Sequence, residues 1–203
     1  MATVVLDREL AEQLREERAA SGLDRWDEVW EGTYVVTPLP NIEHQEIATG
    51  LCAAFATVLD RRQSAVMAGT NVSDREQGWK SNYRCPDAAV YLAGNPAKNC
   101  HTHWCGGPDF AVEIVSEDDR SREKIPFYAS VGTRELLIVD RYPWALELFR
   151  LESGALQSVG VSTLENGQTL TSEVLPFSFR LTAEDDRPSI LVTHTTDGRT
   201  WNV

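Results

Sequence analysis

Three short apolar segments in the middle of the chain constrain the fold more than any other feature of the sequence. They span residues 87–92 (DAAVYL), 110–115 (FAVEIV) and 134–140 (RELLIVD). Apolar side chains occupy successive positions in them, a pattern typical of strands that are covered on both faces. The segments therefore predict the central strands of a sheet with further layers on each side.

Helices are predicted before and after the first of these strands. Residues 6–22 place leucines at positions 6, 10 and 14 among charged residues and end at a glycine, which indicates an amphipathic N-terminal helix. Asn41 is placed to cap a second helix that runs to about Asp60. A third helix is expected over residues 120–131, with a glycine after it. One face of the second helix is predicted to hold Ile42, Ile47, Leu51, Ala54, Phe55 and Val58.

The remaining segments predict further strands and one long loop. Residues 28–40 indicate a strand running into a turn, and residues 65–72 indicate another strand. Residues 94–108 are rich in glycine, proline and asparagine and predict a loop. Residues 144–159 alternate around a Ser-Gly pair, which predicts a hairpin. The order of elements predicts an α/β fold in the broad sense, that is, an α+β arrangement in which a mixed sheet is flanked by helices.

Length and composition favour one domain. The chain has 203 residues, 42% of them hydrophobic, which is enough to bury one sizeable core, so we expect a single domain over 1–203 with a C-terminal extension over 171–203. The first twenty residues carry charge throughout, so we expect neither a signal peptide nor a membrane span, and a cytoplasmic location. Four cysteines are too few for a disulfide scaffold.

The net charge of −12 argues mildly against tight, non-specific binding of DNA, because such binding depends on cations that neutralise phosphates. A local basic rim remains compatible with this charge. Its candidate residues are Arg61, Arg62, Arg75, Lys80, Arg84, Arg120, Arg122 and Lys124.

Two carboxylates lie on the predicted central strands. Asp87 begins one of these strands, and Glu113 lies inside another, where a charge is costly unless it is paired or bound to a metal. Carboxylates at the ends of neighbouring strands can hold a hard cation such as Mg²⁺. The alternative is a buried salt bridge between Glu113 and an arginine.

Several segments together resemble the Uma-two family, which consists of restriction-endonuclease-like proteins of the PD-(D/E)XK superfamily. The segments are WDEVWEGTYVVTPLPNIEHQEI, RCPDAAVYL, PDFAVEIVSEDDR and ASVGTRELLIVD followed by WALELFRL. They occur in the order of the family and cover roughly Trp26 to Leu151. The resemblance implies a restriction-endonuclease-like fold.

The resemblance also implies the site. Asp87 matches the aspartate of the family's Pro-Asp pair and Glu113 the glutamate of its valine-glutamate-valine strand, so these two are the implied metal ligands. Glu28 and His44 match family positions expected near them. The superfamily's lysine normally stands two residues after the glutamate, where this chain has Val115.

In the family the lysine comes from the following helix, where Lys124 matches it, and Tyr128 lies on the same helical face. A lysine ammonium there can orient the attacking water and offset charge on the phosphate. Near it the chain differs from the family: Ser116-Glu117-Asp118 replace a Ser-Pro-Ser sequence, Arg120 replaces an aspartate, and Pro126 enters the predicted helix.

The implied function is a metal-dependent endonuclease that cleaves DNA with Mg²⁺ or Mn²⁺. A homodimer is expected, because cutting both strands of a duplex calls for two sites, and Trp26, Trp30 and Trp144 are candidates for its interface. Two alternatives remain: a degenerate nuclease fold that binds DNA or protein without catalysis, and a hydrolase of another phosphodiester, RNA or a nucleotide.

A zinc site is a weaker possibility in the loop that contains Cys100, His101, His103 and Cys105. These residue types are the preferred zinc ligands, but structural sites usually take two pairs from separate turns. Four candidates within six residues, with only Cys85 as a distant helper, argue against this site.

Overall fold

The computed structural model describes residues 2–116 and 120–203, and its centre is a six-stranded mixed sheet. The strand order is β13-β12-β11-β10-β7-β4, in which β10 and β11 are parallel and the other neighbours are antiparallel. The predicted mixed sheet is therefore present. The strands are β4 (Ser64–Ala68), β7 (Ala88–Leu92), β10 (Phe110–Ile114), β11 (Glu135–Arg141), β12 (Trp144–Glu152) and β13 (Ala155–Ser162).

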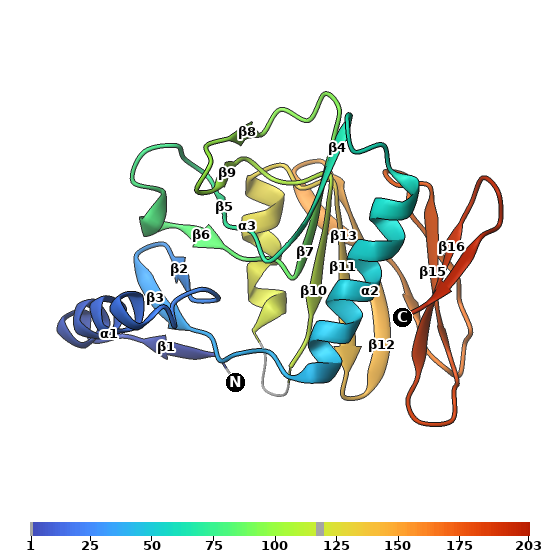
Figure 1. Cartoon of the computed structure of the whole chain (residues 1–203), viewed down its shortest axis with the longest axis horizontal. Coiled ribbons are helices and arrows are strands. Elements are labelled where there is room, and N and C mark those ends of the chain that lie inside the picture. Colours follow the sequence, from blue (N-terminus) through green and yellow to red (C-terminus); the bar gives the residue numbers. More distant parts are fainter. Residues whose placement is uncertain (1, 117–119) are drawn as a thin grey trace.

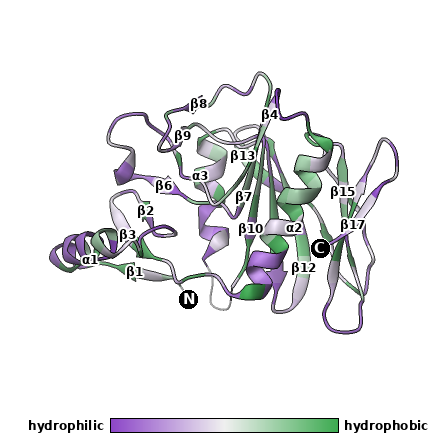
Figure 2. Cartoon of the chain, viewed as in Figure 1, coloured by the Kyte–Doolittle hydropathy of each residue, from purple (hydrophilic) through white to green (hydrophobic). Residues whose placement is uncertain are grey.

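The central strands are buried on both faces, as their continuous apolar pattern predicts. Phe110, Val112 and Ile114 of β10 pack into the main core with helix α2 (Ile42–Val58), whereas Ala111 packs on the other face against helix α3 (Ile125–Ser130). Figure 2 shows β7 and β10 as hydrophobic strands at the centre of the molecule. Glu113 lies on the α3 side, because side chains alternate along a strand.

Helix α2 begins where the sequence predicts it. The Asn41 side chain accepts a hydrogen bond from the His44 backbone N–H, which satisfies one of the free amides at the helix start. His44, Ile47, Leu51 and Phe55 lie on the buried face. Ile42 was expected on this face, but it is 80% exposed because the first residue of the helix projects past the edge of the core.

The third helix starts later than predicted. Residues Ser121–Lys124 form a 3₁₀ turn, η2, and the α-helix α3 begins only at Ile125. Pro126 lies in the first turn of α3, where its missing N–H costs no helical hydrogen bond. The proline thus sets the start of the helix, and Lys124 sits at the junction between the two turns.

A second sheet joins three strands near the N-terminus to two antiparallel pairs of short strands from residues 72–105. Its order is β1-β3-β2-β6-β5-β9-β8, and Figure 1 shows α1 next to β1 and β3 on the side of the molecule away from the C-terminal strands. The elements are β1 (Thr3–Val5), α1 (Arg8–Ser21), β2 (Glu28–Trp30), β3 (Thr33–Val36), β5 (Val72–Ser73), the 3₁₀ turn η1 (Trp79–Ser81), β6 (Tyr83–Arg84), β8 (Lys98–Asn99) and β9 (Trp104–Cys105).

This sheet corrects several sequence predictions. Residues 28–40 form a hairpin rather than one strand, because the chain reverses at Glu31 and Gly32, both with positive φ. Residues 65–72 divide between two sheets at Gly69, and the loop 94–108 contributes β8 and β9. Helix α1 is present, but Leu10 is 47% exposed and the helix has no buried residue.

The C-terminal extension forms a third sheet that the sequence did not predict. Its order is β14-β15-β16-β17, with β14 (Leu170–Thr171), β15 (Phe177–Thr182), β16 (Ser189–His194) and β17 (Thr200–Asn202). Figure 1 shows α2 between this sheet and the six-stranded sheet, and Phe177, Phe179 and Ile190 join the main core there. Among the described helices, none is long and apolar enough to cross a membrane.

Candidate active site

A pocket of about 260 Å³ opens between the start of α2, the ends of β7 and β10, and the β2–β3 hairpin. Five of the residues that the sequence singles out line it: Glu28, His44, Asp87, Glu113 and Lys124. Tyr128 lies behind the pocket and reaches it through a hydrogen bond to Glu113. Residues 117 and 118, part of the Ser-Glu-Asp segment that departs from the family pattern, lie outside the described residues.

Lys124 joins two carboxylates at the floor of the pocket. Its Nζ is 2.9 Å from Oε1 of Glu28 and 2.9 Å from Oε2 of Glu113. Burial alone would lower the pKa of Lys124, but the negative charges of Glu113 and Glu28 outweigh it and raise the pKa well above the usual value. The ammonium is therefore charged at neutral pH.

Glu28 is fixed on both of its oxygens. Trp30, two residues on and on the same face of β2, donates its indole N–H to Oε2 at 2.6 Å, and the backbone N–H of Cys85 donates to Oε1 at 2.8 Å. These contacts hold the Glu28 side chain in the pocket, whereas the sequence alone was also compatible with a position on the surface. The period of two along β2 is the signal that would have linked Trp30 to Glu28.

Glu113 is held by the helix that follows it. The hydroxyl of Tyr128 donates to Oε1, and the ammonium of Lys124 donates to Oε2. Burial raises the pKa of Glu113 to about 8; Lys124 opposes this shift, and the charges of Asp87 and Glu28 add to it. The alternative of a buried arginine partner for Glu113 is not what the structure shows, since its cationic partner is Lys124.

Asp87 is held from two directions through one oxygen. The backbone N–H of Ile114 donates to Oδ2 at 2.7 Å, and Nε2 of His44 lies 3.2 Å from the same atom. Within the described residues, no hydrogen bond or ion pair uses Oδ1. His44 reaches Asp87 because the Asn41 cap places the first turn of α2 at the end of the sheet.

The donor set of the pocket fits a hard divalent cation. Three carboxylates, Glu28, Asp87 and Glu113, share the pocket with one lysine, and the raised pKa of Glu113 reflects burial together with the uncompensated negative charge. Among the described residues, no three His, Cys, Asp or Glu side chains form a ready-made metal cluster. Mg²⁺ in proteins is usually held by one or two carboxylates and keeps several waters, so a pocket lined by three carboxylates offers the oxygen donors that this ion prefers.

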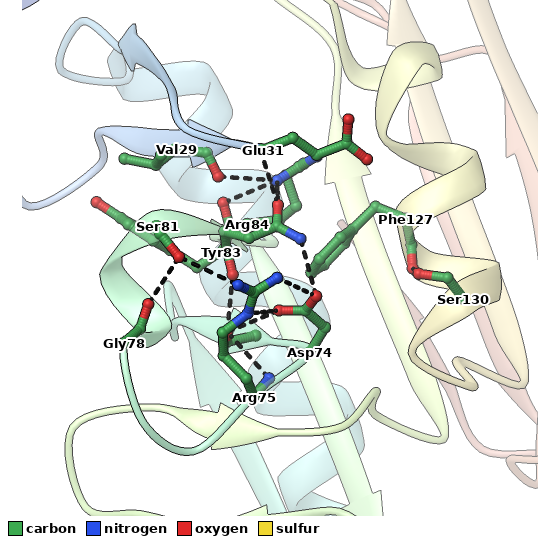
Figure 3. A network of polar contacts seen from close by, with 12 residues as sticks. Val29, Glu31, Asp74, Arg75, Gly78, Ser81, Tyr83, Arg84, Phe127 and Ser130 are labelled. Atoms are coloured by element: carbon green, nitrogen blue, oxygen red, sulfur yellow. Dashed lines mark hydrogen bonds and ion pairs between the residues drawn. The ribbon is translucent and has the colours of Figure 1, made fainter.

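The sequence made Arg84 a candidate for a basic rim, but Arg84 is buried behind the site instead. It is 5% exposed, and its guanidinium stacks 4.3 Å from the Phe127 ring and 4.9 Å from the Trp30 ring. Figure 3 shows it bonded to the carbonyl of Val29, beside Tyr83 and Phe127. Other candidates are engaged in ion pairs, Arg75 with Asp74 and Arg122 with Asp140 and Glu147.

Sequence reasoning missed Arg141, which closes one side of the pocket. It lies at the end of β11 and is 3% exposed, and its guanidinium donates to the carbonyl of Val115, to Asn41, to Glu43 and to Ser116. It thereby ties the end of β10 to the start of α2. A charged residue that ends a buried strand is the signal that could have found it.

The zinc candidates do not gather into a site. His103 is buried, stacks on Trp79 at 4.7 Å and lies 3.0 Å from the carbonyl of Arg75. Among the described residues, which include Cys100 and Cys105, no group of three His, Cys, Asp or Glu side chains could hold a metal ion. The three tryptophans expected on an interface, Trp26, Trp30 and Trp144, are half-buried and not exposed.

Residues 12–184 match the model of the Uma2 (Uma-two) family, which is described as "Putative restriction endonuclease". The chain belongs to the Uma2 family. This span covers most of the chain, including the whole pocket apart from Ala2.

A solved structure shares the fold of this Uma2 protein. It is a putative nuclease of the DUF820 group from Anabaena variabilis, with a TM-score of 0.57 and 16% sequence identity, and the match covers 72% of this chain and 80% of that one. At this identity the likeness concerns the fold alone. No curated protein matches the chain.

Proposed function

We propose that this Uma2 protein is a metal-dependent endonuclease that hydrolyses phosphodiester bonds of DNA. The observation that supports the proposal best is the placement of Asp87, Glu113 and Lys124 around one pocket, two carboxylates for a cation beside an ammonium for the phosphate. Asp87 and Glu113 are the proposed ligands of Mg²⁺ or Mn²⁺. When bound, the cation would act as a Lewis acid on a phosphate oxygen.

The side chains have separate roles in this proposal. Lys124 has three N–H groups, of which two are directed at Glu28 and Glu113, and the third is proposed to orient the attacking water and to offset charge on the phosphate. Glu28 keeps the ammonium charged and in place. Tyr128 holds Glu113, and His44 holds Asp87 through Oδ2, so that the two carboxylates keep fixed directions.

Calorimetry with MgCl₂ or MnCl₂ and a nicking assay on supercoiled plasmid, with EDTA as the control, test the proposal. The wild type should bind the ion and nick the plasmid. Asp87→Asn and Glu113→Gln keep the shape of the side chain but remove charge, so each should lose both activities. Lys124→Ala should still bind the ion while the rate falls by about 10²-fold or more.

The outcomes separate the proposal from its alternatives. A wild type that binds no ion would refute the mechanism. An ion bound without cleavage of any substrate would favour a degenerate module. Cleavage of RNA or of a nucleotide in preference to DNA would favour another phosphodiesterase, an alternative that the net charge of −12 supports because small or single-stranded substrates need fewer cations.

A homodimer belongs to the version of this proposal in which both strands of a duplex are cut, because each strand needs its own site. Sedimentation of the protein at micromolar concentration tests it. A monomer under these conditions would rule out double-strand cleavage by a pre-formed dimer. Cleavage of single strands by the monomer would still be compatible with the result.

A further inference from the structure

The mouth of the active-site pocket differs chemically from its floor. The floor consists of the ionised groups described above, whereas the mouth is lined by Trp26, Pro38, Leu39, Pro40 and Tyr142. Leu39 is 81% exposed and Tyr142 is 67% exposed. Large apolar groups left in water at the entrance to a polar site indicate that a ligand with an apolar face covers them.

Both aromatic residues of the mouth are supported by the protein. The ring of Trp26 lies against Gly69, so closely that a Cβ on this glycine would be 2.3 Å from Cζ3 of the tryptophan. The guanidinium of the buried Arg141 lies 5.7 Å from the centre of the Tyr142 ring. Support of this kind reduces the entropy that a ring loses when a flat ligand stacks on it.

Among the described residues that line the pocket, the lysine and arginine side chains are already paired. They are Lys124, bound to Glu28 and Glu113, and Arg141, which lies 2.7 Å from Glu43. Proteins that hold a duplex through its backbone neutralise several phosphates at once, and each such contact takes a lysine or arginine. The pocket lacks this supply, so stacking of bases is the stronger source of affinity here.

The depth of the pocket also favours stacking of single bases over binding of a duplex. Asp87 and Glu113 lie at the floor with side chains 12% and 2% exposed, in a pocket of about 260 Å³. A volume this small is close to the lower limit of roughly 300 Å³ for ligand pockets, so it admits one nucleotide unit but no stacked base pairs. An extruded or unpaired nucleotide can bring its phosphate to the carboxylates.

We infer that the apolar mouth binds an unpaired nucleobase by stacking on Tyr142 and Trp26, so that the substrate is single-stranded nucleic acid or a single-stranded stretch within a duplex. This inference rests on the proposed function, since the base is the one attached to the phosphodiester at Asp87 and Glu113.

Fluorescence anisotropy of a labelled 12-nucleotide oligodeoxythymidylate, alone and annealed to oligodeoxyadenylate, tests the inference. The whole protein is titrated with Ca²⁺ replacing Mg²⁺, and the probe is checked on a gel for cleavage. The single strand should bind more tightly than the duplex. Tyr142→Ala should weaken single-strand binding by about 5- to 150-fold, the equivalent of one stacked base, whereas Tyr142→Phe should retain it.

Controls keep a folding defect apart from a loss of stacking. Leu164→Ala removes an exposed apolar side chain remote from the pocket and should leave binding unchanged. Trp26→Leu provides a second test at the other aromatic residue of the mouth, and thermal melts followed by circular dichroism show whether each variant is folded. If a Tyr142 variant unfolds, the Trp26 variant decides the question.

Two results would overturn the inference. One is duplex binding as tight as single-strand binding and indifferent to Tyr142→Ala. The other is binding of neither probe by a wild type that binds Mn²⁺ in calorimetry, which leaves the proposed metal site intact. Failure of the proposed function looks different, because calorimetry would then show no ion even where the single strand binds through Tyr142.

Discussion

At the scale of single residues, each carboxylate of the site is held by a neighbouring group that is not itself a proposed metal ligand. Asp87 depends on His44 and on the Ile114 amide, Glu113 on Tyr128, and Glu28 on Trp30. Partners of this kind fix the direction of a ligand without touching the ion. Their removal should therefore weaken metal binding without abolishing it.

His44→Ala tests this for Asp87. Loss of the contact between Nε2 and Oδ2 should let the carboxylate rotate, so the affinity for Mn²⁺ should fall by about 10- to 100-fold. Calorimetry measures the affinity, and His101→Ala, a change in an exposed loop, serves as the matched control. An unchanged dissociation constant in the His44 variant would show that Asp87 is held without it.

Metal affinity should also depend on pH through Glu113. Because the pKa of this carboxyl is raised to about 8, it carries a proton over a range where ordinary glutamates are ionised, and that proton competes with the ion. Binding should weaken as the pH falls from 8.5 to 6.5, with release of a proton on binding. Calorimetry in buffers of different ionisation enthalpy measures both effects; equal affinity at the two pH values would contradict the prediction.

At the scale of elements, the cap of α2 is the contact that positions the helix against the pocket. Asn41 accepts from the His44 amide at 2.9 Å and from Arg141 at 3.0 Å, so it links the helix start to the end of β11. Helix α1 has a similar cap, Asp7, but no buried residue. The two caps should differ in their effect on the whole molecule.

Asn41→Ala should lower the free energy of unfolding by about 1 kcal/mol, the usual cost of losing a cap, and Asn41→Asp should retain most of it. Asp7→Ala should cost less in global unfolding, because α1 can fray without opening the core. Midpoints of urea unfolding compare the variants. Equal losses for Asn41→Ala and Asp7→Ala would show that α1 is as tightly coupled to the core as α2.

At the scale of the whole molecule, one buried glutamate joins the C-terminal sheet to the central sheet. Glu135 on β11 is fully buried and accepts hydrogen bonds from Arg150, from the Ser172 hydroxyl and from the Glu173 amide. Ser172 belongs to the segment between β14 and β15, so this contact attaches the layer that covers α2.

Glu135→Ala should destabilise the fold by about 3 kcal/mol, because it leaves the partly buried Arg150 and a buried hydroxyl without their acceptor. Glu173→Ala removes the exposed partner of the same arginine and should cost less than about 1 kcal/mol. Guanidinium unfolding measures both. A small loss in the Glu135 variant would mean that hydrophobic packing alone holds the third sheet.

The central strands, α1, α2 and the β12–β13 hairpin follow from sequence because their signals are local: apolar runs, helical spacing, an asparagine cap and a Ser-Gly turn. The third sheet escaped prediction because its strands are short and its segments carry no continuous period. The start of α3 was misplaced because Pro126 in its first turn, and not Arg120, decides where the α-helix begins.

The sequence by itself determined the central strands and, through its family resemblance, the carboxylates and the lysine that are candidates for the site. The acidic residues lie in segments whose pattern is local, so it can be recognised without knowledge of the residues that pack against them. Only the tertiary structure decided how these groups meet. Lys124 reaches both Glu28 and Glu113, and Arg141 closes the pocket, through contacts between residues up to a hundred positions apart. Such contacts depend on packing of separate layers, which no local period in a sequence records.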